Sequence, residues 1–153
     1  MPGAPNIHFH YLVQRFHLKH RTRLKGFIKS LITKERRLID AINYIFCSDE
    51  YLLQINQDYL KHQDFTDIIT FQLNAEGAPI LADIYISIDR VKDNALSLEV
   101  SFTEELHRVI FHGALHLCGY KDKSASANRT MRMKEDYYLS RYFVSRETRR
   151  SKL

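Results

Sequence analysis

The sequence predicts an α+β fold in which one mixed β-sheet of about four strands is covered by about five helices. The chain has 153 residues, which is the size of one ordinary domain with a single hydrophobic core. Segments with strand-like composition and segments with helical periodicity follow one another in the order strand, helix, strand, helix, two strands, then helices. This order favours one mixed sheet with helices packed on it. We therefore expect a single domain over residues 1–153.

The first half of the chain contains two predicted strands, each followed by a helix. Alternation over residues 7–16 predicts the first strand. From about Lys19 apolar residues recur at the spacing of an amphipathic helix. Residues 38–47 are rich in Ile and aromatic side chains and predict the second strand. Ser48 can cap a helix that we expect to end near His62.

The middle of the chain predicts two further strands, over residues 66–73 and 79–88, joined by a turn at Gly77. A short helix is expected over residues 90–98.

Two helices are predicted in the last third. Ser101 and Glu104 form a capping-box pattern that opens a long helix reaching Cys118, and Gly119 stands where a helix C′ residue belongs. A last helix fits residues 125–143. We expect the basic segment from about 144 to 153 to form a flexible tail.

The charge is unevenly distributed. The net charge is +5. Residues 1–48 contain nine Lys or Arg residues and two acidic residues, and residues 49–105 contain three Lys or Arg residues and twelve acidic residues. Residues 106–153 contain eleven Lys or Arg residues and four acidic residues. Basic terminal segments around an acidic middle segment are typical of a protein that binds RNA, although solvated helix faces would give the same pattern.

Composition also limits the setting in which the protein works. Two cysteines are too few for a disulfide framework, which favours a reducing, cytoplasmic location. We find no signal-peptide pattern and no apolar run long enough to span a bilayer, so no membrane partner is expected.

The segment HGALHLCGYKD, residues 112–122, carries the chemistry. Four residues advance a helix by about 400°, so His112 and His116 project from nearly the same line on the central helix and can share one ion. His107 is turned well away. A turn at Gly119 can return Asp122 towards the pair, giving two His and one carboxylate with coordination positions left open. The competing interpretation is a core helix with two stray histidines.

The same segment resembles the signature of the YbeY family, bacterial endoribonucleases that mature ribosomal RNA, whose motif reads H-G-x-L-H-L-x-G-Y-D-H. The matching residues are His112, Gly113, Leu115, His116, Leu117, Gly119 and Tyr120. Further matches to the family's conserved stretches are Asn56, Tyr59, Thr66, Asp67 and Phe71, and the segments ADIYIS and EELHRVIFHG. The resemblance covers most of the chain.

The resemblance implies a metal-dependent endoribonuclease acting on small-subunit rRNA or its precursor, with the ribosomal subunit or ribosome-associated proteins as further partners. It implies one divalent ion held by His112, His116 and Asp122, with Zn²⁺ as first choice and Ni, Fe or Mn as alternatives. The basic residues expected to contact RNA are Lys61, Lys121, Lys123, Arg21, Arg23 and Lys25.

This chain departs from the family pattern at two places. Asp122 stands where the family has its third histidine, after Lys121 in place of an aspartate. Leu60 stands where the family has an arginine thought to act at the cleaved phosphate, and Lys61 could supply the charge without bidentate geometry.

The reaction and its alternatives follow from these residues. An ion at this site would polarise a phosphate oxygen or activate water. The position of the glutamate base in HExxH peptidases is Gly113, which counts against proteolysis. No general base is assigned; Asp67, Glu104 and Glu105 are candidates by position only. The alternatives are a non-catalytic RNA- or ribosome-binding assembly factor with a structural or degenerate metal site, and a metal hydrolase with another substrate.

Overall fold

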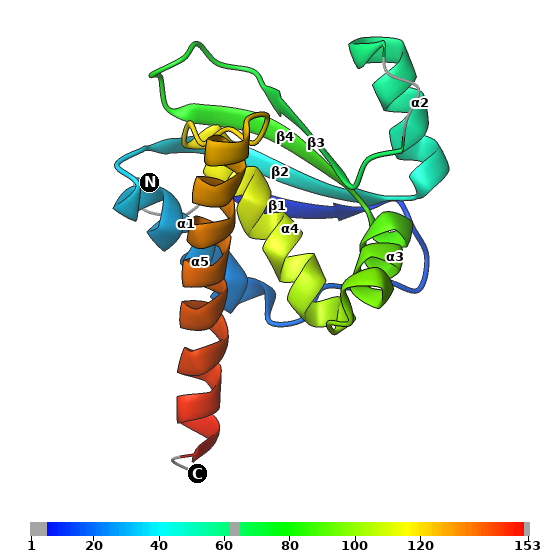
Figure 1. Cartoon of the computed structure of the whole chain (residues 1–153). Coiled ribbons are helices and arrows are strands. Elements are labelled where there is room, and N and C mark those ends of the chain that lie inside the picture. The colour runs from blue at the N-terminus through cyan, green and yellow to red at the C-terminus, as the bar shows by residue number, and fades with distance from the viewer. Residues whose placement is uncertain (1–5, 62–64, 152–153) are drawn as a thin grey trace.

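The computed structural model describes residues 6–61 and 65–151, and within them it contains the predicted four strands and five helices (Figure 1). The elements in chain order are β1 (Ile7–Tyr11), α1 (Arg21–Lys34), β2 (Ile39–Cys47), α2 (Asp49–Leu60), β3 (Ile68–Gln72), β4 (Ile80–Ser87), α3 (Ile88–Leu98), α4 (Phe102–Leu117) and α5 (Ala125–Ser151).

The four strands form one mixed sheet, as predicted, and their order in it is β1-β2-β4-β3. The pairs β1·β2 and β2·β4 are parallel, and β3 pairs antiparallel with β4. The antiparallel pair follows from the short connection between β3 and β4, whereas the parallel pairs need a crossover. This arrangement places β3 at one edge of the sheet.

The helices cover both faces of the sheet. Alternate residues of β4 point to opposite faces: Ile84 belongs to the main core with side chains of α1, α4 and α5, while Tyr85 packs against the smaller cluster formed with α2. Figure 1 shows α4 crossing the sheet with α5 beside it and α2 at the far end. The HxxxH helix is therefore central, as predicted.

Both predicted ends of α4 are confirmed. The Ser101 hydroxyl accepts a hydrogen bond from the backbone N–H of Glu104 at 3.0 Å and caps the first turn. After Leu117 the chain reverses at Gly119, whose φ of +107° is a conformation that only glycine adopts freely. The turn leads the chain from α4 into α5.

Gly113 allows α4 to approach the sheet closely. A Cβ atom at this position would lie 3.0 Å from Cδ1 of Ile68 and 3.2 Å from Cδ1 of Ile84. The helix-propensity cost of the glycine is therefore offset by side chains of β3 and β4, and no backbone is the close neighbour.

Some predicted bounds differ from the structure. The first strand ends at Tyr11 instead of residue 16, helix α3 begins at Ile88 instead of residue 90, and helices α2 and α5 end at other residues than expected. Helix α2 ends at Leu60, and His62, the expected end, lies outside the described residues. Helix α5 continues to Ser151 and projects from the body in Figure 1, so most of the basic segment 144–153 prolongs the helix; its mobility stays a prediction. Among the described residues, no helix has the length and apolar character that a membrane crossing requires.

Candidate metal centre

A polar cavity of about 320 Å³ lies where α4, α5 and the start of β3 meet. Helix α4 contributes His112 and His116, the turn after it contributes Asp122, and α5 contributes Glu135. The structure thus brings the three predicted metal ligands to one cavity, together with an acid that sequence reasoning missed.

His112 is held between two carboxylates. Its Nδ1 atom lies 2.7 Å from Oε2 of Glu135, and its Nε2 atom lies 3.2 Å from Oδ2 of Asp122. Because an ionised carboxylate only accepts, the contact with Glu135 requires a proton on Nδ1, and the opposite nitrogen, Nε2, faces Asp122 and the cavity. Burial alone would lower the pKa of His112, but the hydrogen bond and the charge of Glu135 raise it overall.

His116 lies one helical turn after His112 and has the opposite electrostatic balance. Desolvation of its ring in the cavity lowers its pKa, and the neighbouring charge of His112 lowers it further, against the attraction of Asp122. The pKa shift favours the neutral imidazole, which is the form that binds a metal ion.

These donors fit a divalent ion, although they do not form a preformed cage. Among the described residues, no cluster of three or more His, Cys, Asp or Glu side chains is arranged to hold a metal. However, the 3.2 Å between His112 Nε2 and Asp122 Oδ2 is close to the separation of about 3.3 Å expected for two donors on one tetrahedral zinc ion. Glu135 contacts Nδ1 of His112, the ring nitrogen that would not face the ion. A carboxylate or carbonyl at this nitrogen ordinarily orients metal-binding histidines.

The charge of the cavity also suits a cation. Its lining holds the four carboxyl groups of Asp67, Glu105, Asp122 and Glu135 and the two guanidinium groups of Arg108 and Arg132. When all are ionised, the excess is two negative charges, which one divalent ion would neutralise.

Among these acids, Glu105 is buried and Asp67 is half-buried. Burial raises the pKa of Asp67, against the charge of His112, and burial also raises the pKa of Glu105, against the charge of Arg108. The Oε1 atom of Glu105 is buried without a hydrogen-bond partner. Both are thus placed to hold or release a proton inside the cavity.

Glu135 carries a signal that could have identified it from the sequence. The residues Met131, Glu135, Tyr138 and Tyr142 share the spacing of one helix face, and all four are buried. Burying a carboxylate without a hydrogen-bond or ion-pair partner costs free energy, so an acid inside an apolar stripe indicates that such a partner lies opposite it. Here the partners are His112 and Arg108.

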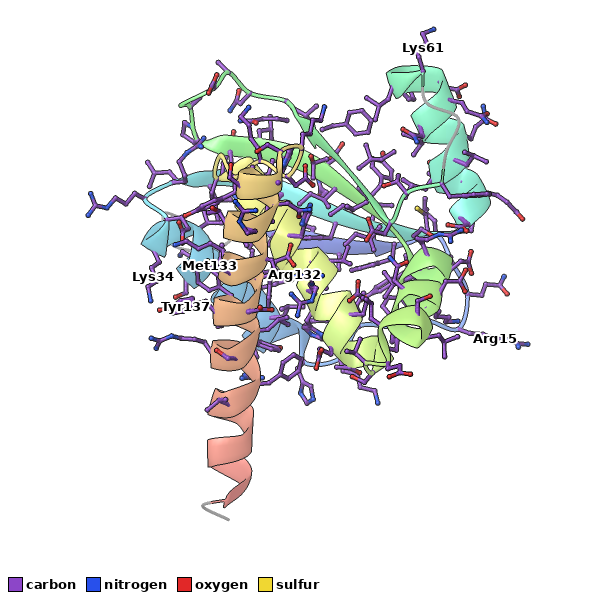
Figure 2. The ribbon with its side chains drawn as sticks, in the orientation of Figure 1. Arg15, Lys34, Lys61, Arg132, Met133 and Tyr137 are labelled. Atoms are coloured by element: carbon purple, nitrogen blue, oxygen red, sulfur yellow. The ribbon has the colours of Figure 1, made fainter. Side chains whose placement is uncertain are left out.

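The six basic residues predicted to contact RNA do not line the cavity. Lys61 adopts a left-handed conformation at the C-terminal end of α2, and Figure 2 shows its side chain pointing away from the body. Lys121 and Lys123 are exposed beside Asp122, and Arg21 is exposed on α1.

Two of the α1 cations pack on aromatic rings. Arg23 donates to the carbonyl of Tyr142 and covers its ring at 4.0 Å, and Lys25 lies 5.7 Å from the ring centre of Phe9. Their packing role does not test RNA contact, which stays a prediction.

His107 does not line this cavity, as expected. Its ring is buried and stacks on Tyr142 at 5.2 Å between centroids, and its Nδ1 atom lies 2.7 Å from the carbonyl oxygen of Thr103.

Comparison with known proteins places the chain among endoribonucleases. The family model described as Endoribonuclease YbeY matches residues 13–143. The Endoribonuclease YbeY of Cytophaga hutchinsonii is 49% identical over 126 residues, which cover 82% of this chain and 88% of that protein. The Endoribonuclease YbeY of Flavobacterium psychrophilum is 47% identical over 138 residues, covering 90% of this chain and 97% of that protein.

A solved structure shares the fold. The solution structure of TM1509 from Thermotoga maritima superposes with a TM-score of 0.63 at 24% sequence identity, and the match covers 96% of this chain and 95% of that one.

Proposed function

The chain belongs to the YbeY family of endoribonucleases, and on that premise we propose that it hydrolyses RNA phosphodiester bonds with the help of a divalent metal ion, in the maturation of ribosomal RNA. The observation that supports the metal is the chain of contacts from Glu135 through His112 to Asp122, at 2.7 and 3.2 Å. This chain of contacts presents a nitrogen and an oxygen donor on the cavity that His116 also lines.

His112, His116 and Asp122 would hold the ion. Two imidazoles and one carboxylate favour Zn²⁺ and leave Ni, Fe and Mn as alternatives. When bound, the ion supplies Lewis-acid chemistry for phosphodiester hydrolysis.

The remaining groups of the cavity would orient these ligands and handle protons. Glu135 holds the proton on Nδ1 of His112 and so keeps Nε2 directed into the cavity. Asp67 and Glu105, whose pKa values burial raises, can accept or donate a proton at a carboxyl oxygen. We assign neither as the general base.

RNA as substrate follows from the family and is supported by the basic first and last thirds of the chain. Contacts from such segments to phosphates would be salt-dependent and largely blind to sequence. Selection of one site in rRNA would then depend on the ribosomal subunit or a ribosome-associated protein presenting it.

The decisive test compares cleavage of a structured RNA by the wild-type protein and by His116→Ala, after metal content and thermal unfolding have been measured for both. We expect cleavage to be lost in His116→Ala while folding is retained. His8→Ala, an exposed histidine on β1 outside the cavity, is the matched control and should cleave like the wild type.

The second candidate function is a non-catalytic assembly factor that binds RNA or the ribosome. The presence of Leu60 and Asp122 in place of two functional residues of the family pattern favours it. Equal cleavage by the wild type and His116→Ala, or none by either, together with retained RNA binding, would support this alternative.

A further inference from the structure

Besides Glu135, helix α5 contributes two polar side chains to the lining of the cavity that holds the histidine pair. Asn128 and Arg132 both line it. They are four residues apart, so they lie next to each other on one face of the helix. Figure 2 shows Arg132 on the side of α5 that faces α4, whereas Met133 and Tyr137 lie on the other side.

The two arginines of the cavity differ in how fully they are paired. Arg108 lies 3.1 Å from Glu135 and 2.8 Å from Asp136, and its side chain is 16% exposed. Arg132 lies 3.7 Å from Glu135, and its side chain is 53% exposed. Arg108 therefore pairs closely with the buried carboxylate of Glu135 and the exposed one of Asp136, while the more exposed guanidinium of Arg132 makes only a longer contact with Glu135.

An RNA phosphate that enters this cavity brings a further negative charge to a lining that carries more carboxyl groups than guanidinium groups, so a cationic side chain close to the phosphate would favour its binding beside the metal ion. Lys61 does not line the cavity, and its side chain points away from the body in Figure 2. Arginine suits the task because its planar fork can donate two parallel hydrogen bonds to one phosphate.

We propose that Arg132, with the Asn128 amide beside it, is a phosphate-binding subsite of the cavity and contacts the RNA backbone at or next to the bond that is cut. The proposal rests on the proposed function for its substrate. It replaces the expectation that Lys61 supplies this charge. The Arg132 guanidinium binds two phosphate oxygens, and the Asn128 side-chain N–H donates to a third acceptor on the same or the adjacent nucleotide.

The experiment uses the full-length protein loaded with Zn²⁺ and a short single-stranded RNA bearing a fluorophore and a quencher. The variants are Arg132→Ala, Arg132→Lys and Asn128→Ala. The control is Arg141→Ala, which removes the same charge from an exposed arginine of α5 that lies over the ring of Tyr137, outside the cavity. Steady-state cleavage gives kcat and KM, anisotropy gives RNA affinity, and metal content and thermal unfolding are measured for every variant.

We expect Arg132→Ala to lower kcat/KM by about 10- to 100-fold, the usual loss for one hydrogen-bonded charged contact, with unchanged metal content. Arg132→Lys should recover part of this loss because it restores the charge without the fork. Asn128→Ala should lose less, by about threefold to tenfold. Arg141→Ala should stay within about twofold of the wild type.

The outcomes separate this proposal from the proposed function. If the wild type cleaves, His116→Ala does not, and Arg132→Ala matches Arg141→Ala in both kcat/KM and RNA affinity, the phosphate subsite is wrong and the nuclease stands. If the wild type does not cleave RNA, the proposed function fails, and the subsite is then judged by RNA affinity alone. Should Arg132→Ala unfold, the Arg132→Lys variant decides, because a subsite predicts a partial loss and a purely structural role predicts none.

Discussion

The Nδ1 atom of His112 lies 2.7 Å from the Oε2 atom of Glu135, which is buried on the neighbouring helix. Because Nδ1 is engaged there, the opposite nitrogen is the one that faces Asp122 and the cavity. An acid on α5 thus controls which atom of an α4 histidine is available as a ligand.

The first prediction concerns this bond. Glu135→Gln keeps the side chain's shape but removes the charge that stabilises the Nδ1 proton, and we expect zinc affinity to fall by about 10- to 100-fold. Affinity is measured by competition with a chromophoric zinc chelator.

The matched control is Asp136→Asn, because Asp136 also pairs with Arg108 at 2.8 Å but does not line the cavity. Equal zinc affinity in the wild type and Glu135→Gln would show that Glu135 stabilises the fold without supporting a metal ligand.

The second prediction concerns the unusual third ligand. A carboxylate is a harder donor than an imidazole, so Asp122→His should raise affinity for zinc relative to manganese, and Asp122→Ala should weaken both. The ratio of the two metal affinities, obtained by competition titration, reports the change. Lys123→Ala, an exposed neighbour outside the cavity lining, should leave the ratio unchanged. A ratio that does not move in Asp122→His would remove Asp122 from the ligand set.

The histidine pair could be predicted from the sequence because its geometry is local. A four-residue spacing on a helix with recognisable ends places His112 and His116 on one line whatever the rest of the chain does. The turn at Gly119 was also a local signal, and the structure confirms that it returns Asp122 to His112. Strand and helix order followed from periodicity in the same way.

The remaining cavity residues depend on tertiary packing. Glu135 and Arg132 reach the site only because α5 packs beside α4. The spacing of Glu135 within an apolar stripe indicates that it is buried, but it does not indicate which side chain lies opposite. Lys61 shows the same dependence on tertiary structure. Its place next to Leu60 in the sequence suggests a role at the phosphate, whereas in the structure α2 ends at Leu60 and the side chain of Lys61 points away from the body, so its RNA contact stays a prediction.

The third prediction tests the close approach of α4 to the sheet. Gly113→Val would place methyl groups against Ile68 and Ile84, where even a Cβ atom comes within 3.0 to 3.2 Å. We expect a loss of about 1–3 kcal/mol in the free energy of unfolding, measured by urea denaturation.

The matched control is Gly26→Ala in α1, where an added Cβ meets nothing within 4 Å. Removing a glycine from an open helix position should stabilise the protein by about 0.5–1 kcal/mol. An unchanged or higher free energy of unfolding in Gly113→Val would mean that the side chains of Ile68 and Ile84 can move aside without loss of stability.

The last prediction concerns Glu35, which ties the end of α1 to the turn before α5 and to α5 itself. The Tyr120 hydroxyl donates to it at 2.7 Å, the Lys134 ammonium lies 3.1 Å away, and the Tyr138 hydroxyl donates to the same oxygen as Lys134. Burial would raise the pKa of the Glu35 carboxyl, but these three partners lower it overall.

A lowered folded-state pKa means that the ionised group stabilises the fold above its unfolded pKa, which is close to the ordinary glutamate value. This stability is lost as the pH falls through the folded pKa. Glu35→Gln should therefore be less stable than the wild type by about 1–3 kcal/mol at pH 7, and the difference should shrink as the solution is made more acidic than the ordinary glutamate pKa. Urea unfolding of both proteins across this acidic range measures it, and a difference that stayed constant with pH would show that the ionised form of Glu35 contributes nothing to stability.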